Sequence, residues 1–215
     1  SGDPVGATKC FQYFNLRKKG QGRNGRGTSN SWGGGGFSQT LQDAMAGLDQ
    51  PGMAPIIHAA AAGNSSNNND ASLFYPASYD LANIIAVAAS DHNDLYASFS
   101  SYCATTVDVA APGANILSTV PTGTCSLCDP TGYKSLNGTS MATPHVAGAA
   151  ALIWAQYPNL TASETKQRIL WGSDYIGDKG SNAAKPTVTN GRLNLFNSLE
   201  NDTTPPAAVT NLAAS

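Results

Sequence analysis

The sequence is organised around one stretch of small residues, Asn137-Gly138-Thr139-Ser140-Met141-Ala142-Thr143-Pro144-His145-Val146-Ala147-Gly148. Its glycine and threonine allow a tight turn, and the apolar run from Val146 to Trp154 predicts a fully buried helix. Ser140 is therefore expected at the N-terminus of this helix, where unpaired N–H groups and the helix dipole stabilise negative charge. A lone serine before a helix is usually only a cap. The alternative is a nucleophile.

The length of the motif favours the nucleophile. Residues 138–148 resemble the nucleophile motif of the subtilisin-like serine peptidases, the subtilases, and subtilisin itself is one of the enzymes that define this chemistry. Four further segments resemble the family in the same order, so that the resemblance covers roughly residues 31–199: Ala60–Asn64, Tyr75–Ala77, Ala97–Ser101 and Val109–Gly113. The resemblance implies an α/β fold, a doubly wound and mostly parallel sheet with helices on both faces, whose N-terminal half is missing here.

Composition narrows the class of partner. The 215 residues carry a net charge of −2 with 12% charged residues, which argues against nucleic acid or an anionic membrane as a partner. No apolar run reaches the roughly 18 residues of a membrane span, and no signal peptide opens the chain. Abundant Gly, Ala, Ser, Thr and Asn are typical of secreted bacterial enzymes. We therefore expect an extracellular, processed or truncated protein.

The four cysteines, Cys10, Cys103, Cys125 and Cys128, allow three pairings into two disulfides, and the sequence does not choose among them. The last two have the spacing of redox and zinc sites, but they lie in a turn-rich loop without further ligands. We expect a disulfide that staples this loop. No redox or nucleotide cofactor is expected.

The sequence predicts three parts. Residues 1–30 form an irregular N-terminal segment, in which Phe11 to Leu16 have the spacing of a short helix and the basic residues that follow are interpreted as solvated. Subtilases place an apolar strand just before the segment that matches Ser31, but residues 21–28 contain no apolar side chain. Either a loop replaces that strand or this portion of the sequence is aberrant. Residues 31–200 are interpreted as the C-terminal half of the catalytic domain. Residues 201–215 are interpreted as a linker and the start of a fibronectin type III module.

The histidines are not expected to act as the base. Residues 55–62 predict a buried strand of a parallel sheet, and His58 lies inside it. Six residues separate it from Asn64, which is about 20 Å along a strand. His58 is therefore interpreted as a core histidine. His92 is interpreted as a solvated loop residue, and His145 as turned away from Ser140.

The resemblance assigns the remaining site residues. Asn64 and the N–H of Ser140 are implied to bind the oxyanion. The implied substrate-binding residues form an extended segment, a strand end, a pocket floor and the turn before the nucleophile: Ser31, Trp32, Gly33, Gly34, Ala61, Ala62, Gly63, Phe74 and Thr139. The bond Tyr75-Pro76 matches one that is cis in the family. A structural calcium ion is implied at the backbone of Ala77 and Tyr79.

The acid and base motifs of the family, Asp-Ser/Thr-Gly and His-Gly-Thr-His, do not occur in these 215 residues. Two function classes follow. The first is a serine endopeptidase present as a fragment that is inactive alone, whose partners are protein or peptide substrates and a missing N-terminal half of the same domain. The second is a degenerate, non-catalytic subtilase module that binds extended peptides. Intact Asn64 and Ser140 favour the first.

Overall fold

The computed structural model describes residues 3–22, 24–50 and 52–200, so the predicted linker at 201–215 lies outside them. Six strands form one sheet in the order β1-β2-β3-β4-β8-β7. The parallel strands are β1 (Gly27–Asn30), β2 (Ile57–Ala61), β3 (Ile84–Ser90), β4 (Val109–Pro112) and β8 (Gly191–Arg192). β7 (Asp174–Tyr175) pairs antiparallel with β8. The predicted fold class is confirmed.

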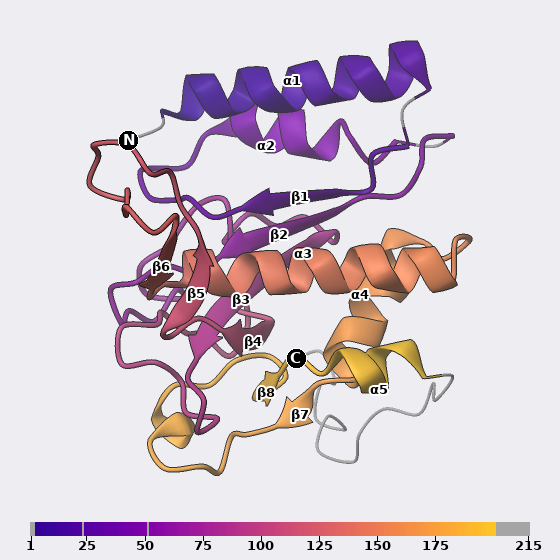
Figure 1. The fold of residues 1–215 in the computed structure, drawn as a ribbon. Helices are drawn as coiled ribbons and strands as arrows, with labels where there is room; N and C mark the ends of the chain where they lie inside the picture. Colours follow the sequence, from indigo (N-terminus) through magenta and orange to yellow (C-terminus); the bar gives the residue numbers. More distant parts are fainter. Residues whose placement is uncertain (1–2, 23, 51, 201–215) are drawn as a thin grey trace.

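Helices cover both faces of this sheet (Figure 1). α1 (Pro4–Gln21) and α2 (Gln39–Ala46) form one layer, and α3 (Thr139–Gln156) crosses the other face, packed on four strands. α4 (Ala162–Trp171) and α5 (Leu195–Leu199) pack beside α3. Among the described residues no helix has the length and apolar character needed to cross a membrane.

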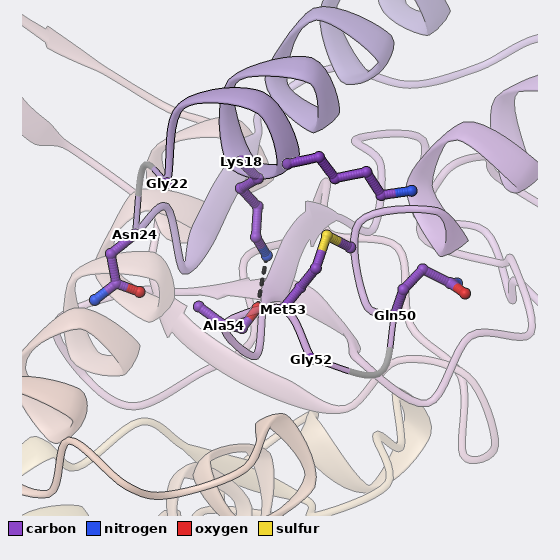
Figure 2. Close-up of a pocket in the computed structure, with 8 residues that line it drawn as sticks. Lys18, Gly22, Asn24, Gln50, Gly52, Met53 and Ala54 are labelled. Atoms are coloured by element: carbon purple, nitrogen blue, oxygen red, sulfur yellow. Dashed lines mark hydrogen bonds between the residues drawn. The ribbon is translucent and has the colours of Figure 1, made fainter.

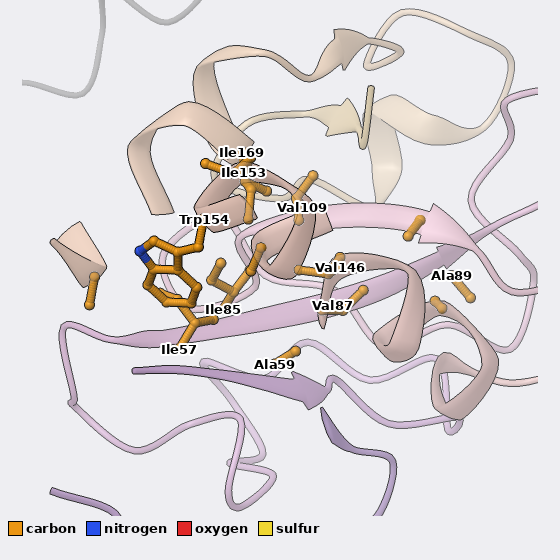
Figure 3. Packing of buried hydrophobic residues seen from close by; sticks show 14 of the residues in the cluster. Ile57, Ala59, Ile85, Val87, Ala89, Val109, Val146, Ile153, Trp154 and Ile169 are labelled. Carbon is orange, nitrogen blue, oxygen red and sulfur yellow. The ribbon is translucent and has the colours of Figure 1, made fainter. Parts of the chain in front are cut away.

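Two apolar clusters hold these layers together. In β2 and β3 every residue is buried, as expected for strands covered on both faces. Alternate strand residues therefore face opposite layers. On the α3 side the cluster joins residues of β2, β3, β4, α3 and α4, shown in Figure 3: Ile57, Ala59, Ile85, Val87, Val109, Val146, Ile153, Trp154 and Ile169. On the α2 side it contains Phe11, Leu41, Met45, Leu48, Ile56, Ala60 and Ala86.

The first 30 residues are more regular than the sequence predicted. α1 spans 18 residues, capped by the Asp3 carboxylate and followed by Gly22 in the left-handed conformation. β1 is a strand although its side chains are polar. Its residues pair with β2 in parallel register, which places Thr28 beside His58. The Thr28 Oγ1 and His58 Nδ1 atoms are 2.7 Å apart and share a hydrogen bond, so a buried polar residue in β2 is matched by a polar residue in β1.

α3 is not buried all round, contrary to the prediction for Val146 to Trp154. Ile153 is fully buried, but Leu152 is 51% exposed. The helix lies on the surface of the sheet, so only its inner face is covered by described residues. Likewise, Lys18 is not a solvated basic residue, since its side chain is buried at the C-terminal end of α1.

The remaining segments form a hairpin and short turns. β5 (Ile116–Thr119) and β6 (Tyr133–Leu136) form a two-stranded antiparallel sheet that leads into α3, and η1 (Asn182–Ala184) precedes β8. The loop between β5 and β6 carries the Cys125–Cys128 disulfide, which confirms the predicted staple. Cys10 and Cys103 are free, so among the described residues one of the two disulfides that four cysteines allow is formed.

Candidate active site

Ser140 lies in the first turn of α3, at the carboxyl end of β4. The turn before it needs a close approach of two backbones, because the Gly138 N–H donates to the Gly113 carbonyl at 2.8 Å. A Cβ on Gly113 would lie only 2.6 Å from the Ala89 Cβ, so glycine is required there. Ligands of open α/β sheets bind at the carboxyl ends of the strands. The turn therefore delivers the serine to the edge where such sites occur.

The Ser140 hydroxyl contacts the segment that follows β1. Its Oγ donates to the Ser31 carbonyl at 3.0 Å, and the Ser31 Oγ donates to the Ser140 carbonyl at 2.7 Å. These two bonds hold the ends of β1 and α3 together across 109 residues of sequence. A peptide carbonyl accepts a hydrogen bond but is not a general base. Within the described part of the chain, no residue in hydrogen-bond reach of Ser140 can take its proton.

Thr139 fixes the orientation of Asn64. The Thr139 N–H and hydroxyl both donate to the Asn64 Oδ1, at 2.8 and 2.9 Å, and the hydroxyl accepts from the Gly63 N–H at 3.2 Å. Since Oδ1 receives two donors, the amide Nδ2 must be the outward atom. Gly63 has φ 109°, a conformation that favours glycine, and it turns the chain so that the exposed Asn64 follows the buried strand β2.

Two N–H donors consequently flank one turn. A Cβ placed on Gly138 would lie 3.4 Å from the Asn64 Nδ2 and 3.5 Å from the Ser140 nitrogen. Neither donor has an acceptor among the hydrogen bonds of the described residues. A pair of fixed donors beside a hydroxyl can stabilise negative charge that develops on a substrate oxygen.

The predicted wall segments meet at Phe74. A Cβ atom added to Gly33 would lie 2.2 Å from the Phe74 ring and would collide with it. A Cβ atom added to Gly63 would lie 3.3 Å from the same ring. It therefore fills the space between the two glycine segments. The Gly34 N–H donates to the Tyr75 carbonyl at 3.0 Å, which ties the exposed segment 31–34 to the residues after Phe74.

The other predicted wall residues lie elsewhere. Ala61, the last residue of β2, and Ala62, which follows it, are both buried. Trp32 is 39% exposed and lines a cavity of about 330 Å³ between α1 and β1, together with Ala7, Cys10, Phe11, Phe14, Gly27, Thr28 and Asn30. The structure thus brings together Ser31, Gly33, Gly34, Gly63, Asn64, Phe74, Thr139 and Ser140, whereas Trp32 lines the cavity beside α1.

His58 is a core residue, as predicted. It is fully buried, its Nε2 lies 3.3 Å from the Met45 carbonyl, and its ring meets the Phe11 ring edge to face at 5.7 Å. Burial lowers the pKa of His58 to about 4, so the ring is neutral at pH 7. His145 is exposed and its Nδ1 lies 2.9 Å from the Met141 carbonyl, while His92 is an exposed loop residue.

The calcium prediction rests on backbone carbonyls. Tyr75-Pro76 is cis as expected, and both Ala77 and Tyr79 are buried. The Tyr79 carbonyl already accepts from the Leu81 N–H at 2.9 Å. No group of three or more His, Cys, Asp or Glu side chains suited to a metal occurs among the described residues. Backbone carbonyls are among the oxygen ligands that calcium takes in proteins. Calcium at these carbonyls stays a prediction.

A larger cavity, of about 760 Å³, lies at the C-terminal end of α1 (Figure 2). Its lining residues are Lys18, Lys19, Gly22, Asn24, Gln50, Gly52, Met53 and Ala54, none of them a predicted site residue. The Lys18 ammonium donates to the carbonyls of Leu48 and Ala54, at 2.9 and 2.6 Å. Burial lowers the pKa of Lys18, and the two carbonyls stabilise its charge. The sequence does not predict the burial of Lys18, because this burial depends on a contact with Ala54, which lies 36 residues away in the sequence.

Comparison with known proteins adds a second line of support. The model of the subtilase family matches residues 25–192. Subtilisin DY from Bacillus licheniformis is 45% identical over 149 residues, 69% of this chain and 49% of that protein. Thermitase from Thermoactinomyces vulgaris is 41% identical over 160 residues, 74% of this chain and 49% of that protein. The chain therefore spans about half the length of these curated relatives.

Solved structures agree. A cold-adapted subtilisin-like serine proteinase superposes with a TM-score of 0.68 at 29% identity, covering 87% of this chain and 62% of that one. A protease structure from Pseudoalteromonas arctica gives a TM-score of 0.65 at 28% identity, covering 82% of this chain and 50% of that one.

Proposed function

Since this chain belongs to the subtilase family, we propose that it is part of a secreted serine endopeptidase in which Ser140 is the nucleophile. The observation that carries the proposal is the pair of Thr139 hydrogen bonds to the Asn64 Oδ1, because they aim the free Nδ2 at the turn that holds Ser140. A binding module has no need of an oriented donor pair beside a hydroxyl.

The proposed reaction is acyl transfer. The Ser140 Oγ attacks the carbonyl carbon of the scissile bond, and the carbonyl oxygen becomes an oxyanion that the Asn64 Nδ2 and the Ser140 N–H stabilise. Ser140 lies in the first turn of α3, so the positive end of the helix dipole also stabilises the oxyanion. To attack, the hydroxyl must release its bond to the Ser31 carbonyl and pass its proton to a base.

That base is proposed to come from outside the described residues. The chain spans about half of its curated relatives, and two surfaces fit the addition of more of the same domain. β1 pairs only with β2 among the described strands, which leaves its other edge open. The outer face of α3 displays Leu152 at 51% exposure. The missing half is proposed to cover both surfaces and to supply the acid and base of the triad.

The proposed substrates are extended polypeptides. A peptide strand would lie along the exposed segment 31–34, with main-chain hydrogen bonds supplying affinity. Phe74 shortens the space between Gly33 and Gly63, and neither wall segment carries an acidic residue to pair with Lys or Arg. Cleavage is therefore proposed after apolar side chains of medium size.

The competing function is a degenerate module that binds extended peptides without cleaving them. The decisive experiment treats the whole protein with a fluorophosphonate probe, which labels only an activated serine, and maps the label by mass spectrometry. Label on Ser140 that is abolished in Ser140→Ala supports the peptidase. A folded whole protein that binds extended peptides but takes no label would establish the binding module.

The isolated 215-residue chain is expected to be inactive, because no described residue can take the proton of Ser140. The measurement is turnover of a chromogenic peptide by the purified chain, with Ser140→Ala as the matched control. Turnover that disappears in the variant would mean that a base is present in this chain.

A further inference from the structure

The loop that joins β5 and β6 in Figure 1 carries the Cys125–Cys128 disulfide, and the turn that this disulfide closes contains a leucine. The sequence is Cys125-Ser126-Leu127-Cys128, and Leu127 is 56% exposed. The Cys128 N–H donates to the Cys125 carbonyl at 3.1 Å, which makes the segment a four-residue turn. One side-chain bond, from the Lys134 Nζ to the Ser126 carbonyl at 3.2 Å, joins this turn to β6.

The disulfide prevents this segment from becoming extended. The Cα atoms of Cys125 and Cys128 are 5.0 Å apart. Disulfides hold their Cα atoms within about 6.8 Å of each other, whereas three residue steps of a strand span about 10 Å. Peptidases that bind substrate as an added strand need the extended form. An exposed leucine is therefore held in a shape that such a peptidase cannot use.

We propose that the Cys125–Cys128 disulfide protects the peptide bond between Leu127 and Cys128 from proteolysis, and that reduction of the disulfide removes this protection. A thiol reductant breaks the S–S bond: two electrons and two protons convert the disulfide into two thiols, and the reductant is oxidised to a disulfide. The segment then extends, and a peptidase with an apolar pocket hydrolyses the Leu127–Cys128 amide, adding water to give a carboxylate and an amine.

Cleavage at this position would affect the segment that leads to Ser140. The loop is closed by the bond from the Val120 N–H to the Gly132 carbonyl, 2.9 Å, and β6 runs from there into the turn at Gly138. After cleavage β6 is no longer tethered to β5 by the chain, so their pairing loses the entropic advantage of a closed loop. Reduction of this disulfide would thus allow peptidases to cut the segment that leads into the turn before Ser140.

The test uses the full chain and an added peptidase, chymotrypsin, whose specificity pocket is hydrophobic. It is therefore independent of any activity of the chain itself. The variant Cys125→Ser/Cys128→Ser has no staple, and Cys10→Ser is the matched control that keeps it. Cleavage after Leu127, located by mass spectrometry, is expected at least about tenfold faster in the double variant, because cleavage follows the population of the open form. Wild type that has been reduced with a dithiol and freed of it should match the double variant.

Leu127→Asp in the double variant should restore resistance, since the apolar side chain is lost. Circular dichroism shows whether the fold is intact. Equal rates of cleavage after Leu127 with and without the disulfide would overturn the proposal. So would a double variant that has unfolded and is cut throughout the core, since the disulfide would then hold the whole fold and not guard one bond.

Discussion

Acid should destabilise this protein through His58, and a glutamine at that position should remove the effect. The ring is buried between β2 and α2, with the Thr28 hydroxyl at Nδ1 and the Met45 carbonyl at Nε2. Burial is the main cause of the low pKa, about 4 against an ordinary 6.5. A protonated ring would carry an unpaired charge into the core.

The size and direction of the effect follow from these two values. Because the folded pKa lies below the unfolded one, the stabilising contribution of neutral His58 is complete above pH 6.5. It is lost as the pH falls from 6.5 towards 4. The full loss is about 3 kcal/mol at 1.36 kcal/mol per pH unit, and about 2 kcal/mol of it is lost between pH 7 and pH 4.5.

The assay is urea unfolding of wild type and His58→Gln at several pH values. Glutamine keeps an amide for Thr28 and Met45 but does not titrate. The other titrating groups cancel in the difference between the two proteins, which should shrink by about 2 kcal/mol on going from pH 7 to pH 4.5. A difference that stays constant from pH 7 to pH 4.5 would refute the reasoning.

Three further predictions concern the proposed enzyme as a whole protein. Asn64→Ala should lower kcat by about a hundredfold or more with little change in KM, as for loss of one oxyanion donor, a magnitude established on subtilisin itself; steady-state kinetics measure it. Thr139→Val should also lower kcat, and Thr139→Ser should restore it, because only a hydroxyl donates to Asn64 and accepts from Gly63. Phe74→Gly should shift peptide-library profiles towards larger aromatic residues, and an unchanged profile would place the ring outside the pocket.

Local patterns predicted the elements whose signals lie close together in sequence. The Ser38 hydroxyl accepts from the Leu41 N–H at 3.3 Å, and Thr161 forms a capping box with Glu164, so both helices begin at a polar residue of the type that marks helix starts in a sequence. The buried strand around His58 was equally legible, because parallel strands covered on both faces are nearly continuous in apolar residues.

The features that were missed depend on partners distant in sequence. β1 was not predicted as a strand because its side chains are polar, but Thr28 is polar because His58 lies beside it in the sheet. The isolated histidine in an apolar strand was the available signal that a polar neighbour should be sought. The burial of Lys18 and the free state of Cys10 and Cys103 have no comparable local signal, since both depend on how segments distant in sequence are placed in space.

The described residues supply the groups that would stabilise the oxyanion but not the base that would activate Ser140. Thr139 and Gly63 are sufficient to orient Asn64, so the packing of β2 against α3 fixes the positions of the two oxyanion donors. The Ser140 hydroxyl, in contrast, is held by the Ser31 carbonyl and has no described base. Since removal of the proton is what makes the serine a nucleophile, the half of the domain proposed to supply the base would have to approach Ser140 and displace its bond to Ser31. The open edge of β1 lies directly before Ser31 in the chain, so a strand added there in parallel would end beside that bond.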